Sequence, residues 1–163
     1  PKGLEYEEHP FGIHVSSRPG QRSFEHTLWL VPVNLVAGIG CRRGTPPEAI
    51  ESAVARALET LGLPAAGLGC ICSIDIKSDE QGLLAYTDRN KLPIRFFSAE
   101  QLQAVRGEFS GSEYVRSITG VDNVCERSAV LGGGAGVLIG RKMALDGVTV
   151  ALFKKDFEVV FHE

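Results

Sequence analysis

The sequence contains no long run of apolar residues and no excess of positive charge. Its main apolar stretch, residues 28–39, is interrupted by Pro32, Asn34 and Gly38, and it is shorter than the ~18 residues that a transmembrane helix needs. The net charge is −3, which argues against a polybasic nucleic-acid module, and a hydrophobic share of 44% argues against disorder. We therefore expect a folded chain with no nucleic acid and no membrane among its partners.

Histidine is absent from most of the chain, because none lies between His26 and His162. The sequence also has no C-x-x-C, H-E-x-x-H or G-x-S-x-G motif, which argues against a common metal site or a serine triad. We expect no metal and no cofactor in the domain. Nothing at the start is typical of a signal peptide, and we expect a cytoplasmic protein with free thiols at Cys41, Cys70, Cys72 and Cys125.

Strand and helix signals alternate through the rest of the chain. Apolar runs at residues 35–39, 68–76 and 92–97 are typical of buried parallel strands, and each is followed by a helical pattern. Thr45 is the predicted N-cap of the first helix and Ser98 that of the third, whereas residues 114–118 are ambiguous. Asp146-Gly147 predicts a tight hairpin between two final strands. The expected fold is a three-layer α/β/α domain with a mixed, mostly parallel sheet and an antiparallel C-terminal hairpin.

The chain divides into three predicted parts. Residues 1–27 hold three of the four histidines and a Pro/Gly-rich end, so we interpret them as the tail of a preceding region and a linker, with one short strand at 12–16. Residues 28–155 form the compact domain, and residues 156–163 are a C-terminal tail.

Ligands of such folds bind beyond the carboxyl ends of the parallel strands, which selects the loops at residues 40–46, 77–80 and 97–101. The first loop combines glycines, Arg42 and Arg43 with the start of a helix, so backbone N–H groups and two guanidinium groups favour an anion there. It is neither a Walker A loop nor a dinucleotide-binding G-x-G-x-x-G motif. The alternative is that both arginines are surface groups that balance nearby acids.

The second loop carries acids and a lysine. Asp75 and Lys77 would share one face of a strand and could perform acid–base chemistry, although an ordinary salt bridge explains them equally well. A purely structural role also explains Asp79 and Glu80, because acidic side chains stabilise the positive end of a helix at its start. Cys125 has the chemistry of a nucleophile but no histidine nearby in the sequence to activate it, so a buried structural thiol is the better interpretation.

Four blocks in order resemble one family. They are VAGIGCRRGT at 36–45, IDIKSDEQGL at 74–83, FFSAEQL at 96–102 and TGVDNVCER at 119–127. Together they resemble the C-terminal domain of the cobalamin biosynthesis protein CbiG, the cobalt-precorrin-5A hydrolase, and its small relative CobE. The resemblance covers residues 30–152.

The resemblance implies that the δ-lactone of cobalt-precorrin-5A is opened with release of acetaldehyde. The substrate that the resemblance implies is a cobalt-containing precorrin, which carries many carboxylates. The resemblance also implies a second partner, the missing N-terminal region of the full-length protein. We assign Asp75, Lys77 and Glu80 as catalytic candidates. The substrate-binding candidates are Arg42, Arg43, Thr45, Ser98 and Asn123.

Two other functions stay open from the sequence. Within the family, the chain would be a CobE-like, non-catalytic module that binds or carries a precorrin. Outside the family, the patterns are also those of an interaction module or a carboxylate-binding enzyme domain.

Overall fold

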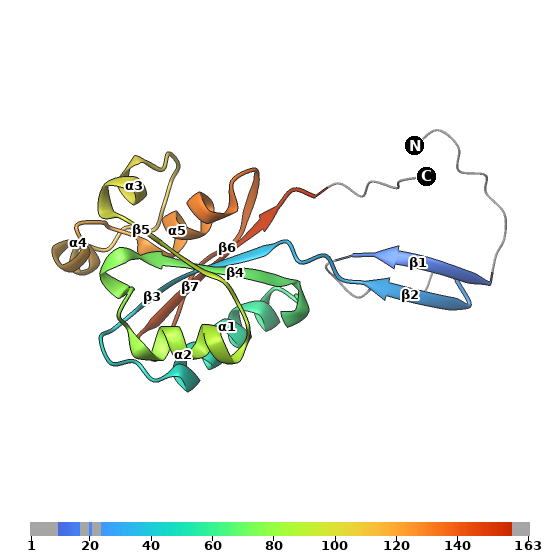
Figure 1. Cartoon of the computed structure of the whole chain (residues 1–163). Coiled ribbons are helices and arrows are strands. Elements are labelled where there is room, and N and C mark those ends of the chain that lie inside the picture. Colours follow the sequence, from blue (N-terminus) through green and yellow to red (C-terminus); the bar gives the residue numbers. More distant parts are fainter. Residues whose placement is uncertain (1–9, 17–19, 21–23, 158–163) are drawn as a thin grey trace.

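The computed structural model describes residues 10–16, 20 and 24–157, which form a two-stranded sheet and a separate five-stranded sheet with helices on both faces (Figure 1). The small sheet pairs β1 (Phe11–Val15) with β2 (His26–Leu30). The other elements, in chain order, are β3 (Leu35–Cys41), α1 (Pro47–Thr60), η1 (Ala65–Gly67), β4 (Leu68–Ile74), η2 (Asp75–Lys77), α2 (Gln81–Arg89), β5 (Ile94–Phe97), α3 (Ala99–Ala104), α4 (Glu113–Thr119), α5 (Val124–Gly133), β6 (Gly136–Leu145) and β7 (Val148–Lys155).

The large sheet is mixed, with the strand order β5-β4-β3-β7-β6. β3, β4 and β5 run parallel, whereas β7 is antiparallel to both β3 and β6. The turn between β6 and β7 places Asp146 at φ 48° and Gly147 at φ 81°, and such positive φ values at both central residues are typical of a tight hairpin. The predicted hairpin and mixed sheet are confirmed.

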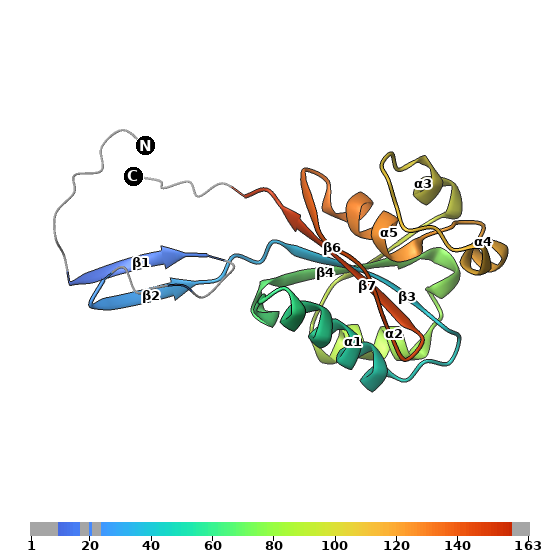
Figure 2. The ribbon, with the colours of Figure 1, turned by 180° about the vertical axis from the view of Figure 1, so that it is seen from behind.

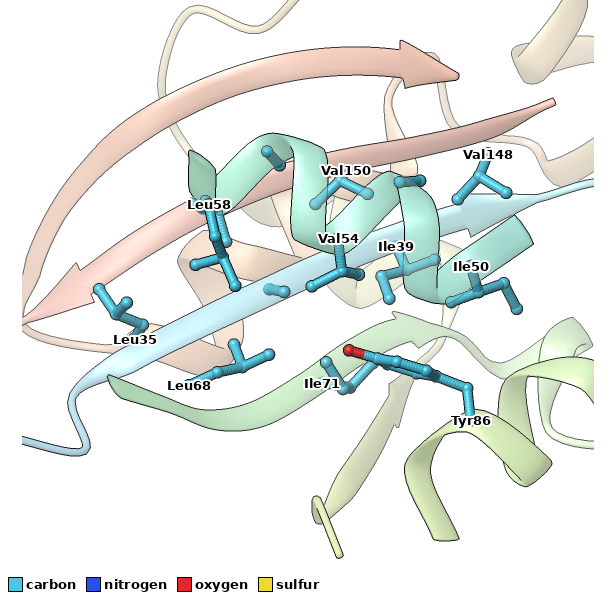
Figure 3. Packing of buried hydrophobic residues seen from close by; sticks show 14 of the residues in the cluster. Leu35, Ile39, Ile50, Val54, Leu58, Leu68, Ile71, Tyr86, Val148 and Val150 are labelled. Atoms are coloured by element: carbon cyan, nitrogen blue, oxygen red, sulfur yellow. The ribbon is translucent and has the colours of Figure 1, made fainter. Parts of the chain in front are cut away.

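One face of this sheet is covered by α1 and α2 (Figure 2). Alternate residues of β3, beginning at Leu35, point to this face and meet the apolar stripe of α1, whose buried members include Ile50, Val54 and Leu58 (Figure 3). Full burial of such a side chain contributes about 1.5–3 kcal/mol. Packing therefore stabilises α1, which has no side-chain hydrogen bond at its N-cap.

The opposite face is covered by α5 and α3, which completes the predicted three layers. Gly38 of β3 lies directly under α5, and a Cβ at this position would lie only 1.9 Å from the carbonyl oxygen of Cys125. The absence of a side chain at Gly38 therefore allows α5 to pack against the backbone of the sheet.

Two predictions about local structure are wrong. The second strand ends at Ile74 and not at residue 76, because its ladder with β5 ends at the pair Ile74↔Phe97, and residues 75–77 form a 3₁₀ turn. Thr45 is not the N-cap of α1. Pro46 precedes Pro47 and is therefore held extended, at ψ 151°, so the helix begins at Pro47.

Other local predictions are confirmed. Ser98 caps α3 in a reciprocal capping box with Gln101, and the short N-terminal strand is present as β1. The stretch at 114–118, which the sequence left ambiguous, is helical in α4. None of the helices in the described part of the chain is long and apolar enough to span a membrane.

Candidate functional site

The three parallel strands end at the same edge of the sheet, and their loops carry most of the predicted site residues. β3 is followed by Arg42, Arg43 and Thr45, β4 by the 3₁₀ turn and Glu80, and β5 by Ser98. Because β3 and β4 are neighbours, the first two loops are in direct contact. We call these two loops the strand mouth.

Glu80 is the centre of the strand mouth. Its carboxylate is buried, and Oε1 accepts a hydrogen bond from the Gly44 backbone N–H at 2.8 Å. Oε2 lies 3.5 Å from the Lys77 ammonium and 3.8 Å from the Arg43 guanidinium, but it accepts no hydrogen bond from any described residue. Lys77 is also buried. The mouth thus contains a buried ion pair with one carboxylate oxygen that still has acceptor capacity.

Arg43 and Arg42 differ in what they contact. Arg43 donates to the Asp79 carboxylate and to the Ile76 carbonyl oxygen, and this guanidinium holds the pKa of the Asp79 carboxyl below its usual value. Arg42 is exposed, and its guanidinium makes no hydrogen bond or ion pair with the residues that the structure describes. Its aliphatic part lies beside Gly147, since a Cβ there would be 3.2 Å from the Arg42 Cδ. Arg42 is therefore the arginine whose donors are available to an anion.

The remaining candidates occupy three kinds of position. Asp75 is exposed. The prediction that Asp75 and Lys77 share one face of a strand is wrong, because both lie in the 3₁₀ turn η2. Thr45 is buried, and its hydroxyl donates to the Arg42 carbonyl oxygen at 2.8 Å. Ser98 and Asn123 use their side chains to cap α3 and α5. The structure thus brings Arg43, Lys77 and Glu80 together and leaves Asp75 free at the same edge.

A close approach of the two loops fixes this arrangement. A Cβ on Gly82, in the first turn of α2, would lie 1.9 Å from the Thr45 carbonyl oxygen. Glycine at residue 82 thus lets the start of α2 pack against the loop that carries both arginines.

A sequence model of the family described as cobalamin synthesis G C-terminus matches residues 35–153. The chain belongs to this family. The resemblance of the four sequence blocks is confirmed, and the match lies within the predicted domain at 28–155, whose limits stay a prediction.

Two curated relatives differ in length. The cobalt-precorrin-5A hydrolase of Salmonella typhimurium is 38% identical over 123 residues, which are 76% of this chain but 35% of that protein. Protein CobE of Sinorhizobium is 33% identical over 135 residues, which are 82% of this chain and 86% of that protein. The chain thus spans about a third of the hydrolase and most of CobE.

Three solved structures share the fold. CobE matches with a TM-score of 0.71 and 32% identity, over 77% of this chain and 93% of CobE. The cobalamin biosynthesis protein chiG of Agrobacterium tumefaciens matches with a TM-score of 0.59 and 27% identity, over 76% of this chain and 99% of that one. A putative cobalamin biosynthesis protein G homolog of Sulfolobus solfataricus has a TM-score of 0.60 at 22% identity, over 88% of this chain and 44% of that one.

The buried carboxylate of Glu126 in this cobalamin synthesis G C-terminal domain was not predicted from the sequence. Glu126 is fully buried, and its oxygens accept hydrogen bonds from the backbone N–H and hydroxyl of Ser110 and from the Lys142 backbone N–H. Its spacing from the N-cap Asn123 is that of a capping box, which would turn its side chain back to the helix start. Glu126 instead joins α5 to the loop before α4 and to β6.

The thiols have distinct environments. Burial raises the pKa of Cys41, which lies near Lys77, Glu80 and Arg43, and it raises that of Cys125 to about 11. On β4, the hydrogen bond with Cys72 lowers the pKa of Cys70 to about 7. Within residues 10–16, 20 and 24–157, no three His, Cys, Asp or Glu side chains are grouped as a metal site would require.

Proposed function

We propose that the chain acts in cobalamin biosynthesis by binding a polycarboxylate cobalt-precorrin at the strand mouth. The observation that carries this proposal is Arg42, an exposed guanidinium without a partner among the described residues, beside a helix start at the carboxyl end of β3. Guanidinium groups bind carboxylates through two parallel, charge-assisted hydrogen bonds. The name of the Salmonella hydrolase and the description of the solved CobE as a protein of the cobalamin biosynthetic pathway support this proposal.

The reaction we propose for a longer form of the protein begins with the opening of the δ-lactone of cobalt-precorrin-5A by water, which breaks the C–O bond of the lactone and frees a carboxylate and an alcohol. Acetaldehyde is then released when this alcohol loses its proton and forms the aldehyde carbonyl, while its C–C bond to the macrocycle breaks and the macrocycle keeps the electron pair and takes up a proton. Asp75 is an exposed carboxylate that can take the proton from the attacking water. Lys77, held by Glu80, can stabilise the negative charge that develops on the lactone carbonyl oxygen. Both residues are at the ends of the strands where ligands of this fold class bind.

A second function, that of a CobE-like binding module, is supported by a different observation. The chain covers most of CobE but only about a third of the Salmonella hydrolase. The strand mouth contains no histidine, and its cysteine has a pKa that burial raises. A mouth with these groups can bind and hold a precorrin without supplying a strong nucleophile.

Replacing Arg42 by glutamine should weaken binding of a corrin with free peripheral carboxylates by about tenfold or more, because a well-formed hydrogen bond to a charged group contributes about 1.5–3 kcal/mol. Isothermal titration of the wild-type chain and the variant measures the effect. Arg56→Gln is the matched control, since Arg56 is an exposed arginine in the middle of α1. Equal affinities of the Arg42 variant and the wild type would remove Arg42 from the site.

Acetaldehyde release distinguishes the enzyme from the binding module. We expect this chain alone to bind cobalt-precorrin-5A but to release little acetaldehyde, and a longer form with the upstream part to release it at a high rate, because that part would supply the groups that the strand mouth lacks. The assay compares both proteins at equal concentration. Full activity of this chain alone would locate the whole site within it, and binding without turnover by the longer form would favour the CobE-like function.

A further inference from the structure

The two-stranded sheet of β1 and β2 has an open apolar face. The strands pair in parallel, with Ile13 opposite Leu28 and Val15 opposite Leu30. Side chains two residues apart share a face of a strand, so the odd positions of β1 and the even positions of β2 lie together. The exposed fractions of the apolar side chains on this face are high: Phe11 69%, Ile13 61%, Val15 36%, Leu28 57% and Leu30 44%.

The other face of the same sheet is covered. The rings of His14 and Trp29 lie 4.3 Å apart, and Phe24 packs so closely over Gly12 that a Cβ there would be 2.0 Å from its ring. The most exposed apolar side chains of the sheet therefore lie together on the face that no described residue covers. A two-stranded sheet with an exposed apolar face is not stable alone in water, so we expect another part of the protein or a partner to cover this face.

The solved structures differ in how much of this chain they match. The CobE and chiG matches use 93% and 99% of those chains and cover 77% and 76% of this one, which residues 35–163 can supply by themselves. The Sulfolobus match covers 88% of this chain, more than residues 35–163 can supply, so its fold extends into the segment before β3. Less than half of the Sulfolobus chain is used in that match. The segment before β3 is thus included in the match to a longer relative.

We propose that the apolar face of β1 and β2 packs against the part of the polypeptide that precedes this domain in longer members of the family. The family description names residues 35–153 as a C-terminus, so the additional chain of the longer relatives lies before it. β1 and β2 lie on that side of the domain in sequence. Together they also line an open hollow of about 650 Å³ that an apolar segment can fill. This inference rests on the proposed function in one respect, since both need a longer form of the protein. It involves none of the residues of the strand mouth.

Hydrogen exchange on the polypeptide as its gene encodes it tests the proposal. We expect the gene to contain coding sequence upstream of Pro1. We also expect the amide hydrogens of β1 and β2 to exchange at least tenfold more slowly in the longer protein than in this chain alone. Ile13→Asp and, separately, Leu28→Asp should abolish that slowing. Ile118→Asp is the matched control, because Ile118 on α4 is 59% exposed, nearly as much as Ile13, and this variant should keep the slow exchange.

Three results would overturn the proposal. They are the absence of upstream coding sequence, equal exchange of β1 and β2 in both proteins, and self-association of this chain that Ile13→Asp abolishes, which would assign the face to a second copy. The melting transition of the five-stranded domain, followed by circular dichroism, shows that each variant is folded. Corrin binding by this chain is measured in the same variants and should stay unchanged, so failure of this inference is distinguishable from failure of the proposed function.

Discussion

Replacing Glu126 by alanine is expected to lower the free energy of unfolding by about 3 kcal/mol or more, because the substitution removes three hydrogen bonds to a fully buried carboxylate. It also disconnects three segments that are far apart in the sequence. The backbone N–H of Lys142 loses this acceptor, whereas Ser110 is exposed and can turn to water. Urea denaturation followed by circular dichroism measures the loss.

Two further variants test whether the expected loss of stability comes from the buried hydrogen bonds of Glu126. In Glu126→Gln, one oxygen becomes an NH₂ group that faces a donor, so we expect a smaller loss than with alanine. Glu113→Ala is the control, since Glu113 is also acidic and in the first turn of a helix but is exposed on α4, and it should cost less than about 1 kcal/mol. A Glu126→Ala variant as stable as Glu113→Ala would contradict the structural role of this carboxylate.

Replacing Lys77 by methionine should cost about 3–5 kcal/mol, because it leaves the Glu80 carboxylate buried without its nearest cation. Adding Glu80→Leu to that variant should recover at least half of the loss, since two apolar groups have no charge to desolvate. The exposed pair of Arg89 and Glu48 is the control, and Arg89→Met should cost less than about 1 kcal/mol. Chemical denaturation of the four proteins gives the free energies.

The same double variant tests catalysis. If Lys77 stabilises the transition state as proposed, acetaldehyde release by the longer form should fall by about 100-fold or more and stay low in the double variant, although stability returns. Recovery of turnover together with stability would show that the pair only maintains the fold.

Local patterns predicted the parts of the fold that short segments determine. The capping box of Ser98 and Gln101 and the Asp146-Gly147 turn depend on residues at most three positions apart, and both were predicted. The N-cap of α1 was mispredicted although the signal was local, because the restriction that Pro47 imposes on Pro46 outweighs the capping preference of Thr45.

Contacts between distant segments could not be predicted in this way. The pairing of Arg43 with Asp79, 36 positions away, leaves Arg42 as the arginine of this loop without a partner among the described residues, and no spacing rule connects Arg43 with Asp79. The sequence also predicts that acids and cations share one sheet edge, since strand ends collect there, but not that Glu80 is buried while Asp75 is exposed. That difference arises because β4 ends two residues earlier than its apolar pattern suggests.

The position of β7 has a consequence for the order of events during synthesis. This strand is the last of the described strands to be translated, but it lies between β3 and β6. It contributes Val148, Val150 and Leu152 to one core and Ala151 and Phe153 to the other. Until it emerges from the ribosome, β3 has a partner on one side only, and both layers of helices lack part of the surface that they bury. The nascent domain therefore exposes apolar surface until β7 has been translated, and only then can its sheet and both cores be completed.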